Sequence, residues 1–377
     1  MAWIELVKGD VEHYANKWEK LLSVKGKSKQ KRPLWRQILS ESITSARDLS
    51  ASFEIDQAEI EEVIARYPMR INPYYLSLIR HKNDAIYRQC IPDHREIMDK
   101  KGYDDPLNEE GLSPVPGLTH RYPDRVLFLI SSQCAMYCRF CNRKRKVGTH
   151  SMVTRDSVRQ GLDYIRDHRE IRDVLLSGGD PLLLRNKELY LILKEVRSMS
   201  HVEIIRIGTR VPCTLPQRIT PQLTEMLKKF HPLYIHTHFN HPSEITAESS
   251  AACIRLADAG IPLGCQTVIL KGVNDDPEIM KKLMQMLLTI RVRPYYLFQA
   301  DLARGTSHFW TDLGKGLEIM TGLQGHTSGL CVPHFAIDLP GGGGKVPLLP
   351  EYIMGEDEED LLIRNYKGEE QRYPLYA

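Results

Sequence analysis

Short apolar runs alternate with amphipathic segments through the middle of this 377-residue chain. The runs that read as strands cover residues 126–130, 174–176, 202–207, 233–235, 262–270 and 292–298. Between them, apolar residues recur at helical spacing, as at Val158, Leu162 and Ile165. Strands and helices that alternate in this way predict a parallel sheet with right-handed crossovers, either an open doubly wound sheet or a partial (β/α) barrel.

Local signals mark helix ends, and the wider pattern divides the chain. Thr220 followed by Pro221 is typical of a helix start, because the hydroxyl caps backbone N–H groups and proline needs no hydrogen bond there. Gly260 is typical of a helix end, because glycine adopts the left-handed conformation without strain. We expect a helical extension over residues 1–104, a core over 105–345 and a short C-terminal tail over 346–377.

Composition and charge narrow the class of protein. The formal net charge of +3 is small, and the basic residues are spread along the chain, so nucleic acid is not a predicted partner. Charged residues interrupt the first 22 residues, and no later apolar run is long enough to span a bilayer. We therefore expect a cytoplasmic globular protein without a membrane segment.

Polar residues follow the predicted strands at their carboxyl ends, where parallel α/β folds place their chemistry. They are Cys134, Cys138 and Cys141 after the first strand, Ser177 to Asp180 after the second, Thr209-Arg210 after the third, His236 to His238 after the fourth and Gln299 to Asp301 after the sixth, with Gln266 inside the fifth. Gly178 and Gly179 allow the backbone to approach a ligand closely, and Asp180 can accept a hydrogen bond from an ammonium group.

The three cysteines at 134, 138 and 141 are spaced to converge on one metal centre. Zinc would need a fourth ligand, for which His150 is a candidate. A [4Fe–4S] cluster usually takes four thiolates, so three cysteines leave one iron open to bind a substrate. The CxxxCxxC spacing resembles the signature of the radical S-adenosylmethionine (SAM) superfamily, in which that iron chelates SAM and reductive cleavage yields a 5′-deoxyadenosyl radical.

Two other patterns suggest ligand sites less directly. His236, His238 and His241 could form a second metal site, although alternating histidines at a strand end are often hydrogen-bonded core. The Pro-Gly-Gly-Gly-Gly-Lys run at 340–345 is not a phosphate loop, because Val346 stands where that loop needs Ser or Thr. Lys345 can instead form a Schiff base with a planar partner such as pyridoxal phosphate (PLP), or lie in a flexible surface loop.

The glycine run and several further motifs together resemble the lysine 2,3-aminomutase family. The motifs are THRYPDR before the cysteines, LSGGD, IRIGTR, THFNHP, GVND and RPYY, and the similarity runs from about residue 73 to about residue 366. It implies a partial (β/α)6 radical SAM barrel and an isomerase that moves the α-amino group of L-lysine to the β-carbon. It further implies a [4Fe–4S] cluster, SAM and PLP as cofactors, a homo-oligomer, and an electron donor such as flavodoxin or ferredoxin.

The resemblance also implies roles for individual residues. Cys134, Cys138 and Cys141 would bind the cluster, Lys345 would form the PLP aldimine, Arg121 and Arg125 would lie on the PLP side, Gly178, Gly179 and Asp180 would border SAM, Arg143 would bind the substrate carboxylate, and Asp301 and Asp338 would bind the substrate ε-ammonium group.

The chain departs from the family pattern at three places. Its tail has no cysteine where the family binds zinc between subunits, Asn142 stands where threonine is expected, and Arg304 stands where a neutral residue is usual and could alter the substrate pocket. Alternative functions are a 2,3-aminomutase for arginine, glutamate or ornithine, and a PLP-independent radical SAM enzyme that modifies protein or RNA. A zinc-binding module without enzymatic activity is a third.

Overall fold

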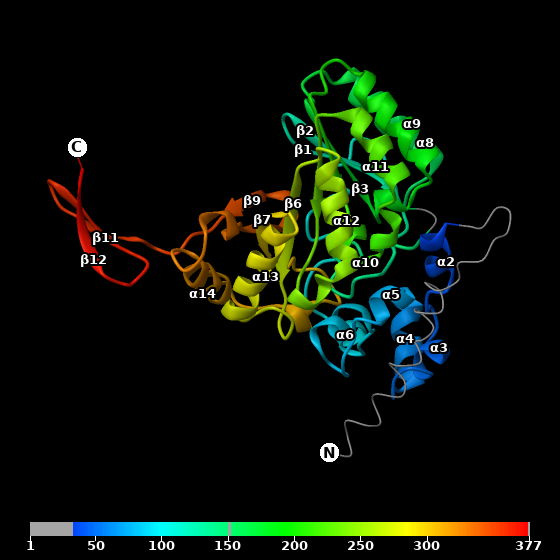
Figure 1. Ribbon diagram of the computed structural model, residues 1–377, viewed down its shortest axis with the longest axis horizontal. Helices are drawn as coiled ribbons and strands as arrows, with labels where there is room; N and C mark the ends of the chain where they lie inside the picture. The colour runs from blue at the N-terminus through cyan, green and yellow to red at the C-terminus, as the bar shows by residue number, and fades with distance from the viewer. Residues whose placement is uncertain (1–32, 150–151, 376–377) are drawn as a thin grey trace.

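The computed structural model describes residues 33–149 and 152–375. Its centre is a nine-stranded sheet whose strands lie side by side in the order of the sequence (Figure 1). The strands are β1 (Leu118–Tyr122), β2 (Arg125–Ser131), β3 (Asp173–Gly178), β4 (Ile204–Gly208), β5 (Leu233–Thr237), β6 (Leu263–Ile269), β7 (Arg293–Gln299), β8 (His334–Leu339) and β9 (Gly344–Pro347). Strands β2 to β8 pair in parallel, and β1 and β9 are antiparallel edge strands.

The six predicted strands correspond to β2 to β7, with β4 beginning at Ile204, two residues after its predicted start. Sequential strand order settles the choice between the two predicted architectures. A doubly wound sheet reverses its strand order at a switch point, whereas right-handed crossovers between consecutive neighbours place every helix on the same face. The partial radical SAM barrel is therefore confirmed, with β8 as an additional parallel strand.

The helices of the barrel connect successive strands. They are α8 (Arg155–Asp167), α9 (Asn186–Ser198), α10 (Val211–Thr214), α11 (Pro221–Leu227), α12 (Ala247–Asp258), α13 (Pro277–Thr289) and α14 (Leu313–Leu323). Both predicted helix ends are confirmed: the Thr220 hydroxyl accepts the Leu223 N–H at the start of α11, and Gly260 after α12 has a φ of 75°. In the part of the chain that the structure describes, no helix has the length and apolar character to cross a membrane.

The two faces of the sheet differ in chemistry. Val174, Leu176, Ile205 and Ile207 are fully buried in the core that the helices share. Side chains alternate between faces along a strand, so the residues between these apolar ones belong to the opposite face. Asp173 and Arg206 form a partly buried ion pair there, with 2.8 Å between Oδ1 and Nε. The barrel interior is therefore polar enough to receive a charged ligand.

The N-terminal extension packs on the barrel as short helices, grouped beside it in Figure 1. They are α2 (Leu34–Ser40), α3 (Ala46–Ser50), α4 (Gln57–Arg66), α5 (Pro73–Leu76), α6 (Ala85–Cys90) and α7 (Arg95–Met98). One continuous hydrophobic core joins Trp35 of the extension to Phe335 of β8. Residues 1–32 of the predicted helical extension lie outside the described residues, and the two boundaries between the three predicted segments stay predictions.

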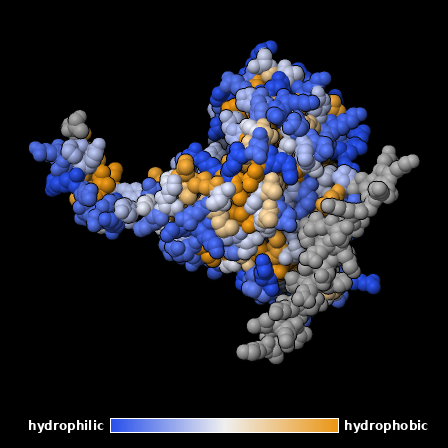
Figure 2. Space-filling model, viewed as in Figure 1, coloured by the Kyte–Doolittle hydropathy of each residue, from blue (hydrophilic) through white to orange (hydrophobic). Residues whose placement is uncertain are grey.

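The C-terminal tail forms a separate antiparallel sheet rather than an irregular end. It contains β10 (Ile353–Glu356), β11 (Asp360–Arg364) and β12 (Glu370–Pro374). The sheet projects away from the barrel (Figure 1), and hydrophobic residues gather on it in Figure 2. Among the exposed side chains are Leu349, Ile353 and Tyr373, which are 70%, 55% and 59% exposed.

Candidate active site

The two edges of the main sheet approach each other through side chains and loops. The Lys345 N–H of β9 donates to the Tyr122 hydroxyl of β1 over 3.0 Å, and the Gly341 N–H donates to the Pro106 carbonyl over 3.1 Å. Strands β1 and β9 do not pair with each other in the described sheet. The barrel therefore has a seam, and Lys345 lies in it.

Lys345 sits in the seam because of the glycines before it. Gly344 has a φ of 86°, which favours glycine, and a Cβ there would lie 3.3 Å from the Tyr122 hydroxyl oxygen. The Lys345 ammonium forms an ion pair with Asp338 of β8, with Nζ 3.0 and 2.9 Å from the two carboxylate oxygens. Nζ also lies 5.1 Å from the ring centre of Phe298 in β7. The side chain of the predicted PLP lysine thus projects toward residues of two neighbouring strands, β7 and β8.

Arg121 and Arg125 lie on the other side of the seam. Arg121 donates to the Leu107 carbonyl and lies 3.6 Å from the Asp338 carboxylate, while its Nε is buried without a hydrogen-bond partner in the described structure. Arg125 stacks on Tyr122 at 4.0 Å and pairs with Asp124. A buried guanidinium donor with no protein acceptor is suited to an anionic group such as a phosphate.

Asp301 follows β7 and is buried close to the same lysine. Burial, with a smaller contribution from the neighbouring Asp338, raises the pKa of the Asp301 carboxyl to about 6, although Asn142 and Lys345 oppose the rise. Its Oδ2 accepts a hydrogen bond from Asn142 Nδ2 over 2.7 Å. Arg304, which the sequence suggested could alter this pocket, instead pairs with Asp104 at 3.4 Å. The structure thus brings Asp301, Asp338 and Lys345 together.

Arg143 is held by a residue that the sequence did not single out. Its Nε and Nη2 donate to the two Glu109 oxygens over 2.7 and 2.5 Å. Burial alone would raise the pKa of Glu109, but the charge and hydrogen bonds of Arg143, together with the charges of Lys146 and Arg121, outweigh burial and lower the pKa. The guanidinium is therefore fixed in direction before any substrate arrives. Glu109 lies in an irregular segment rich in proline and glycine, where no periodicity marks a functional residue.

The three predicted cluster cysteines lie together in the loop after β2, and none forms a disulfide. Burial raises the pKa of the Cys134 thiol, and Asp180 and the neighbouring Cys141 and Cys138 thiols raise it further. Across residues 33–149 and 152–375, no three His, Cys, Asp or Glu side chains are close enough to share one metal ion. The zinc candidate His150 lies outside the described residues.

A buried carboxylate from the extension holds this cluster loop. Glu96 of α7 accepts hydrogen bonds from Arg139, between two of the cysteines, over 2.9 and 2.5 Å. It also accepts one from Lys144 over 2.7 Å. Burial alone would raise the pKa of Glu96, but Arg139 and Lys144 lower it. Burial lowers the pKa of Lys144 to about 8, although Glu96 opposes that effect. No sequence motif connects α7 to the cysteines, so this anchor appears only in the structure.

We expect Glu96→Ala to lower the free energy of unfolding by about 3–5 kcal/mol, because two buried cations lose their partner. The iron content after reconstitution should fall as well. Glu110→Ala is the matched control: Glu110 also bridges two cations, Arg145 and Lys146, but its side chain is 57% exposed. It should cost less than about 1 kcal/mol. Chemical denaturation of both variants measures the difference, and equal losses would contradict the role of Glu96.

The glycine pair of LSGGD packs against the cluster loop. A Cβ on Gly178 would lie 2.2 Å from the Ser131 carbonyl oxygen, and one on Gly179 would lie 2.6 Å from the Gln133 carbonyl oxygen. The close approach expected of these glycines is therefore to the backbone before Cys134. Asp180 accepts from the Thr209 hydroxyl over 2.7 Å and from the Arg210 N–H over 2.8 Å. The Asp180 carboxylate joins the ends of β3 and β4, and its contact with SAM stays a prediction.

Arg210 reaches a cluster cysteine from the end of β4. Its Nη1 lies 2.8 Å from Cys138 Sγ, and its Nη2 donates to Glu244 over 2.7 Å and to Gln89 over 2.6 Å. Glu244 is fully buried and fixes the arginine opposite the sulfur. The position of Arg210 at a strand end was predictable, whereas Glu244 and Gln89 had no signal in the sequence.

His236 lies in β5, and His238 and His241 follow that strand. Burial lowers the pKa of His236 to about 4 and that of His238 to about 3. His236 lies 4.9 Å from Tyr295 between ring centres, and His238 Nε2 is 2.9 Å from Asn240 Oδ1. His241 accepts the Ser243 N–H. His238 and His241 thus match the interpretation as hydrogen-bonded residues, whereas His236 Nδ1 is buried without a hydrogen-bond partner in the described structure.

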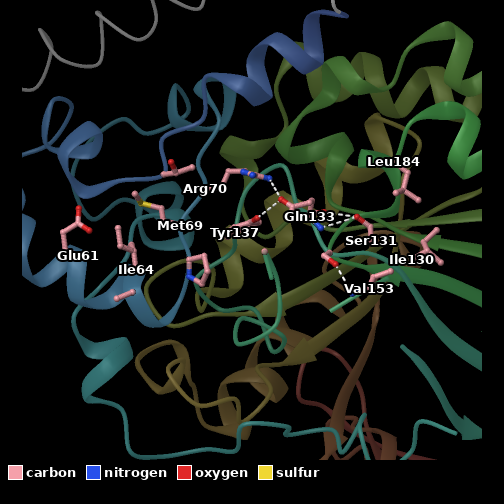
Figure 3. Close-up of a pocket in the computed structure, with 15 residues that line it drawn as sticks. Glu61, Ile64, Met69, Arg70, Ile130, Ser131, Gln133, Tyr137, Val153 and Leu184 are labelled. Carbon is pink, nitrogen blue, oxygen red and sulfur yellow. Dashed lines mark hydrogen bonds between the residues drawn. The ribbon is translucent and has the colours of Figure 1, made fainter. Parts of the chain in front are cut away.

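A cavity of about 730 Å³ lies on the side of the cluster loop that faces the extension (Figure 3). Its walls include Met69 and Arg70 on one side and Ser131, Gln133 and Tyr137 on the other. Arg70 and Tyr137 both donate to the Gln133 side-chain oxygen, over 2.7 and 3.1 Å. None of the predicted site residues lines it. The cavity therefore borders the loop but is separate from the seam that holds Lys345.

Comparisons with known proteins agree with this geometry. The radical SAM superfamily model matches residues 128–284, and the model described as lysine-2,3-aminomutase matches residues 320–375. The L-lysine 2,3-aminomutase of Methanococcus maripaludis is 53% identical, with 84% of this chain and 74% of the relative covered. That of Acetoanaerobium sticklandii is 50% identical over 89% and 82%. The glutamate 2,3-aminomutase of Clostridioides difficile is 44% identical over 93% and 84%.

The two family models fall on the parts of the chain where the site is built. The first spans the cluster loop and most of the barrel, and the second covers β8, the Lys345 hairpin and the C-terminal sheet. Identity near one half over most of both chains shows that this protein belongs to the lysine 2,3-aminomutase family of radical SAM enzymes.

Proposed function

We propose that the protein is an L-lysine 2,3-aminomutase, an isomerase that converts L-lysine to β-lysine. The observation that carries this proposal is the pair of buried carboxylates, Asp301 and Asp338, beside Lys345. In this structure Asp338 pairs with Lys345 and lies 3.6 Å from Arg121. Once those two cations engage PLP, the two carboxylates would attract the side-chain ammonium of lysine. A glutamate substrate would bring a third carboxylate to the same place, and like charges repel. The acidic pair therefore favours lysine over glutamate.

Radical SAM enzymes of this family use a [4Fe–4S] cluster, SAM and PLP. The residues fit these groups. Cys134, Cys138 and Cys141 would hold the cluster, Lys345 would hold PLP covalently, and Arg121, with its unpartnered Nε, and Arg125 would hold the PLP phosphate. When bound, the cluster with SAM supplies a radical that abstracts hydrogen, and PLP supplies the carbonyl that takes the substrate amino group.

The chain itself binds and orients the substrate. Arg143, fixed by Glu109, would take the α-carboxylate in a direction set before binding. Asp301 and Asp338 would take the ε-ammonium group at the opposite end of the substrate. Asp338 holds the proton-bearing Nζ of Lys345 in this structure, so it must exchange that partner for the substrate ammonium once Lys345 is engaged. The α-carbon and β-carbon would then lie between fixed ends, as a positional isomerisation requires.

The test is an anaerobic assay of the reconstituted enzyme with SAM, PLP, a reductant and a panel of L-lysine, L-arginine, L-ornithine and L-glutamate, with NMR detection of β-amino products. We expect β-lysine as the main product. A preference for glutamate would overturn the lysine assignment while leaving the aminomutase class in place.

Asp301→Asn and Asp338→Asn should each lower kcat/KM for L-lysine by about 10- to 100-fold, because each removes a charge-assisted hydrogen bond of roughly 1.5–3 kcal/mol.

With the pKa of Asp301 near 6, the wild-type KM for lysine should rise as pH falls below about 6, because the protonated acid no longer attracts the ammonium group. Asp301→Asn should lose that dependence. Normal lysine turnover in both variants would show that these residues do not recognise the side chain.

We also propose that the enzyme is cytoplasmic, that it is a homo-oligomer, and that an electron donor such as flavodoxin or ferredoxin reduces its cluster. Support for the oligomer comes from the projecting C-terminal sheet, whose exposed apolar side chains and free strand edges suit pairing with a second copy. Light scattering tests this proposal.

A further inference from the structure

The substrate-binding acid Asp301 is tied directly to the cluster loop. Asn142 follows the cluster ligand Cys141 and precedes Arg143, which is proposed to bind the substrate carboxylate. Its amide Nδ2 donates to Asp301 Oδ2 over 2.7 Å, across 159 residues of sequence. Three consecutive residues thus serve the cluster, the substrate side chain and the substrate carboxylate.

The hydrogen bond from Asn142 sets the orientation of the Asp301 carboxylate. In the described structure it is the one hydrogen bond that the Asp301 side chain accepts. Because it engages Oδ2, it leaves Oδ1 without a protein donor. A buried carboxylate held through one oxygen cannot rotate freely and presents the other oxygen to a ligand. Without this donor, nothing else in the described structure would hold the carboxylate by a hydrogen bond.

The chemical type of residue 142 matters as much as its position. An amide donates a hydrogen bond without carrying a charge, so it orients Asp301 and leaves its negative charge uncompensated. A lysine or arginine there would neutralise the carboxylate and remove its attraction for a cationic substrate. The amide thus keeps Asp301 both oriented and charged.

We propose that Asn142 is a specificity-determining residue, which positions Asp301 for the terminal ammonium group of the substrate. This inference rests on the proposed lysine aminomutase function and deepens it. It makes recognition of the substrate side chain depend on a loop that also carries a cluster ligand.

The experiment compares L-lysine with L-norleucine, which has the same carbon chain but no terminal ammonium group. Holoenzyme reconstituted with cluster and PLP is titrated with each ligand, and binding is followed by the change in PLP absorption. In Asn142→Ala we expect the Kd for L-lysine to rise about 10-fold, the loss of one charge-assisted hydrogen bond, with norleucine binding unchanged. KM should rise with it while kcat changes by less than about threefold, since binding rather than the chemical step is affected.

Asn142→Ser restores a hydroxyl donor and should recover part of the lysine affinity. Asn186→Ala, which removes an amide at the start of α9, should bind both ligands as the wild type does. Equal affinity for lysine in wild type and Asn142→Ala would overturn the inference, as would an equal loss for lysine and norleucine. If the wild type does not prefer lysine to norleucine, the proposed function fails and the inference fails with it.

Discussion

Replacing any one of Cys134, Cys138 and Cys141 by alanine should abolish assembly of the [4Fe–4S] cluster and cleavage of SAM. Each thiolate would bind a separate iron, so the loss of one would leave no substitute. The other described cysteines cannot take its place, because Cys90, Cys213, Cys253, Cys265 and Cys331 are buried in the core. Iron and sulfide analysis, with the electron paramagnetic resonance spectrum of the reduced protein, measures the result.

Cys331→Ala is the control for this prediction. Cys331 is a buried thiol outside the cluster loop, so its replacement should leave the iron content at the wild-type value. A cluster cysteine variant that keeps its full iron content and still cleaves SAM would mean that the three thiolates do not form the ligand set.

Replacing Lys345 by alanine should eliminate both covalent attachment of PLP and aminomutase activity. An amine is needed to form a Schiff base, and Lys345 is placed between Phe298 and Asp338 and close to Arg121. Borohydride reduction followed by peptide mapping should find PLP on Lys345 in the wild type and on no residue in the variant. The cluster should assemble normally, because Lys345 belongs to the seam and not to the loop after β2.

Lys315→Ala provides the comparison, since Lys315 is on the outer helix α14 and pairs with Glu318. That variant should keep PLP and activity. PLP trapped on a different lysine in the wild type would show that the glycine run ends in an ordinary loop residue.

Much of the barrel was predictable because its signals are local. A strand buried on one face alternates in polarity every second residue, and each of the six predicted runs coincides with one strand from β2 to β7. Thr220 and Gly260 act on the backbone beside them, so their effect needs no knowledge of the rest of the fold. The seventh parallel strand, β8, overlaps a further strand-like run at residues 332–337, but neither its hairpin with β9 nor the folded C-terminal sheet was predicted.

The parts of the candidate site that have local sequence signals were predictable as well. The cysteine spacing and the glycine run before Lys345 are contained within a few residues each, so the sequence alone determined the cluster loop and the PLP lysine as candidates. It also placed Asp301 at a strand end. The sequence could not show that the Asp180 carboxylate would accept hydrogen bonds from Thr209 and Arg210. Nor could it show that Arg304 would pair with Asp104 away from the pocket.

Only the tertiary structure decided which charged groups meet. Glu109 and Arg143 are 34 residues apart, Glu96 and Arg139 are 43 apart, and Tyr122 and Lys345 are 223 apart. Periodicity shows which face of an element is buried. An ion pair instead depends on which two segments the whole fold brings close enough for their charged side-chain atoms to lie about 3 Å apart. The sequence thus determined most of the barrel strands and the candidate reactive residues. The folded barrel, its seam and its N-terminal helices determined their partners, because those contacts form between segments that no local pattern connects.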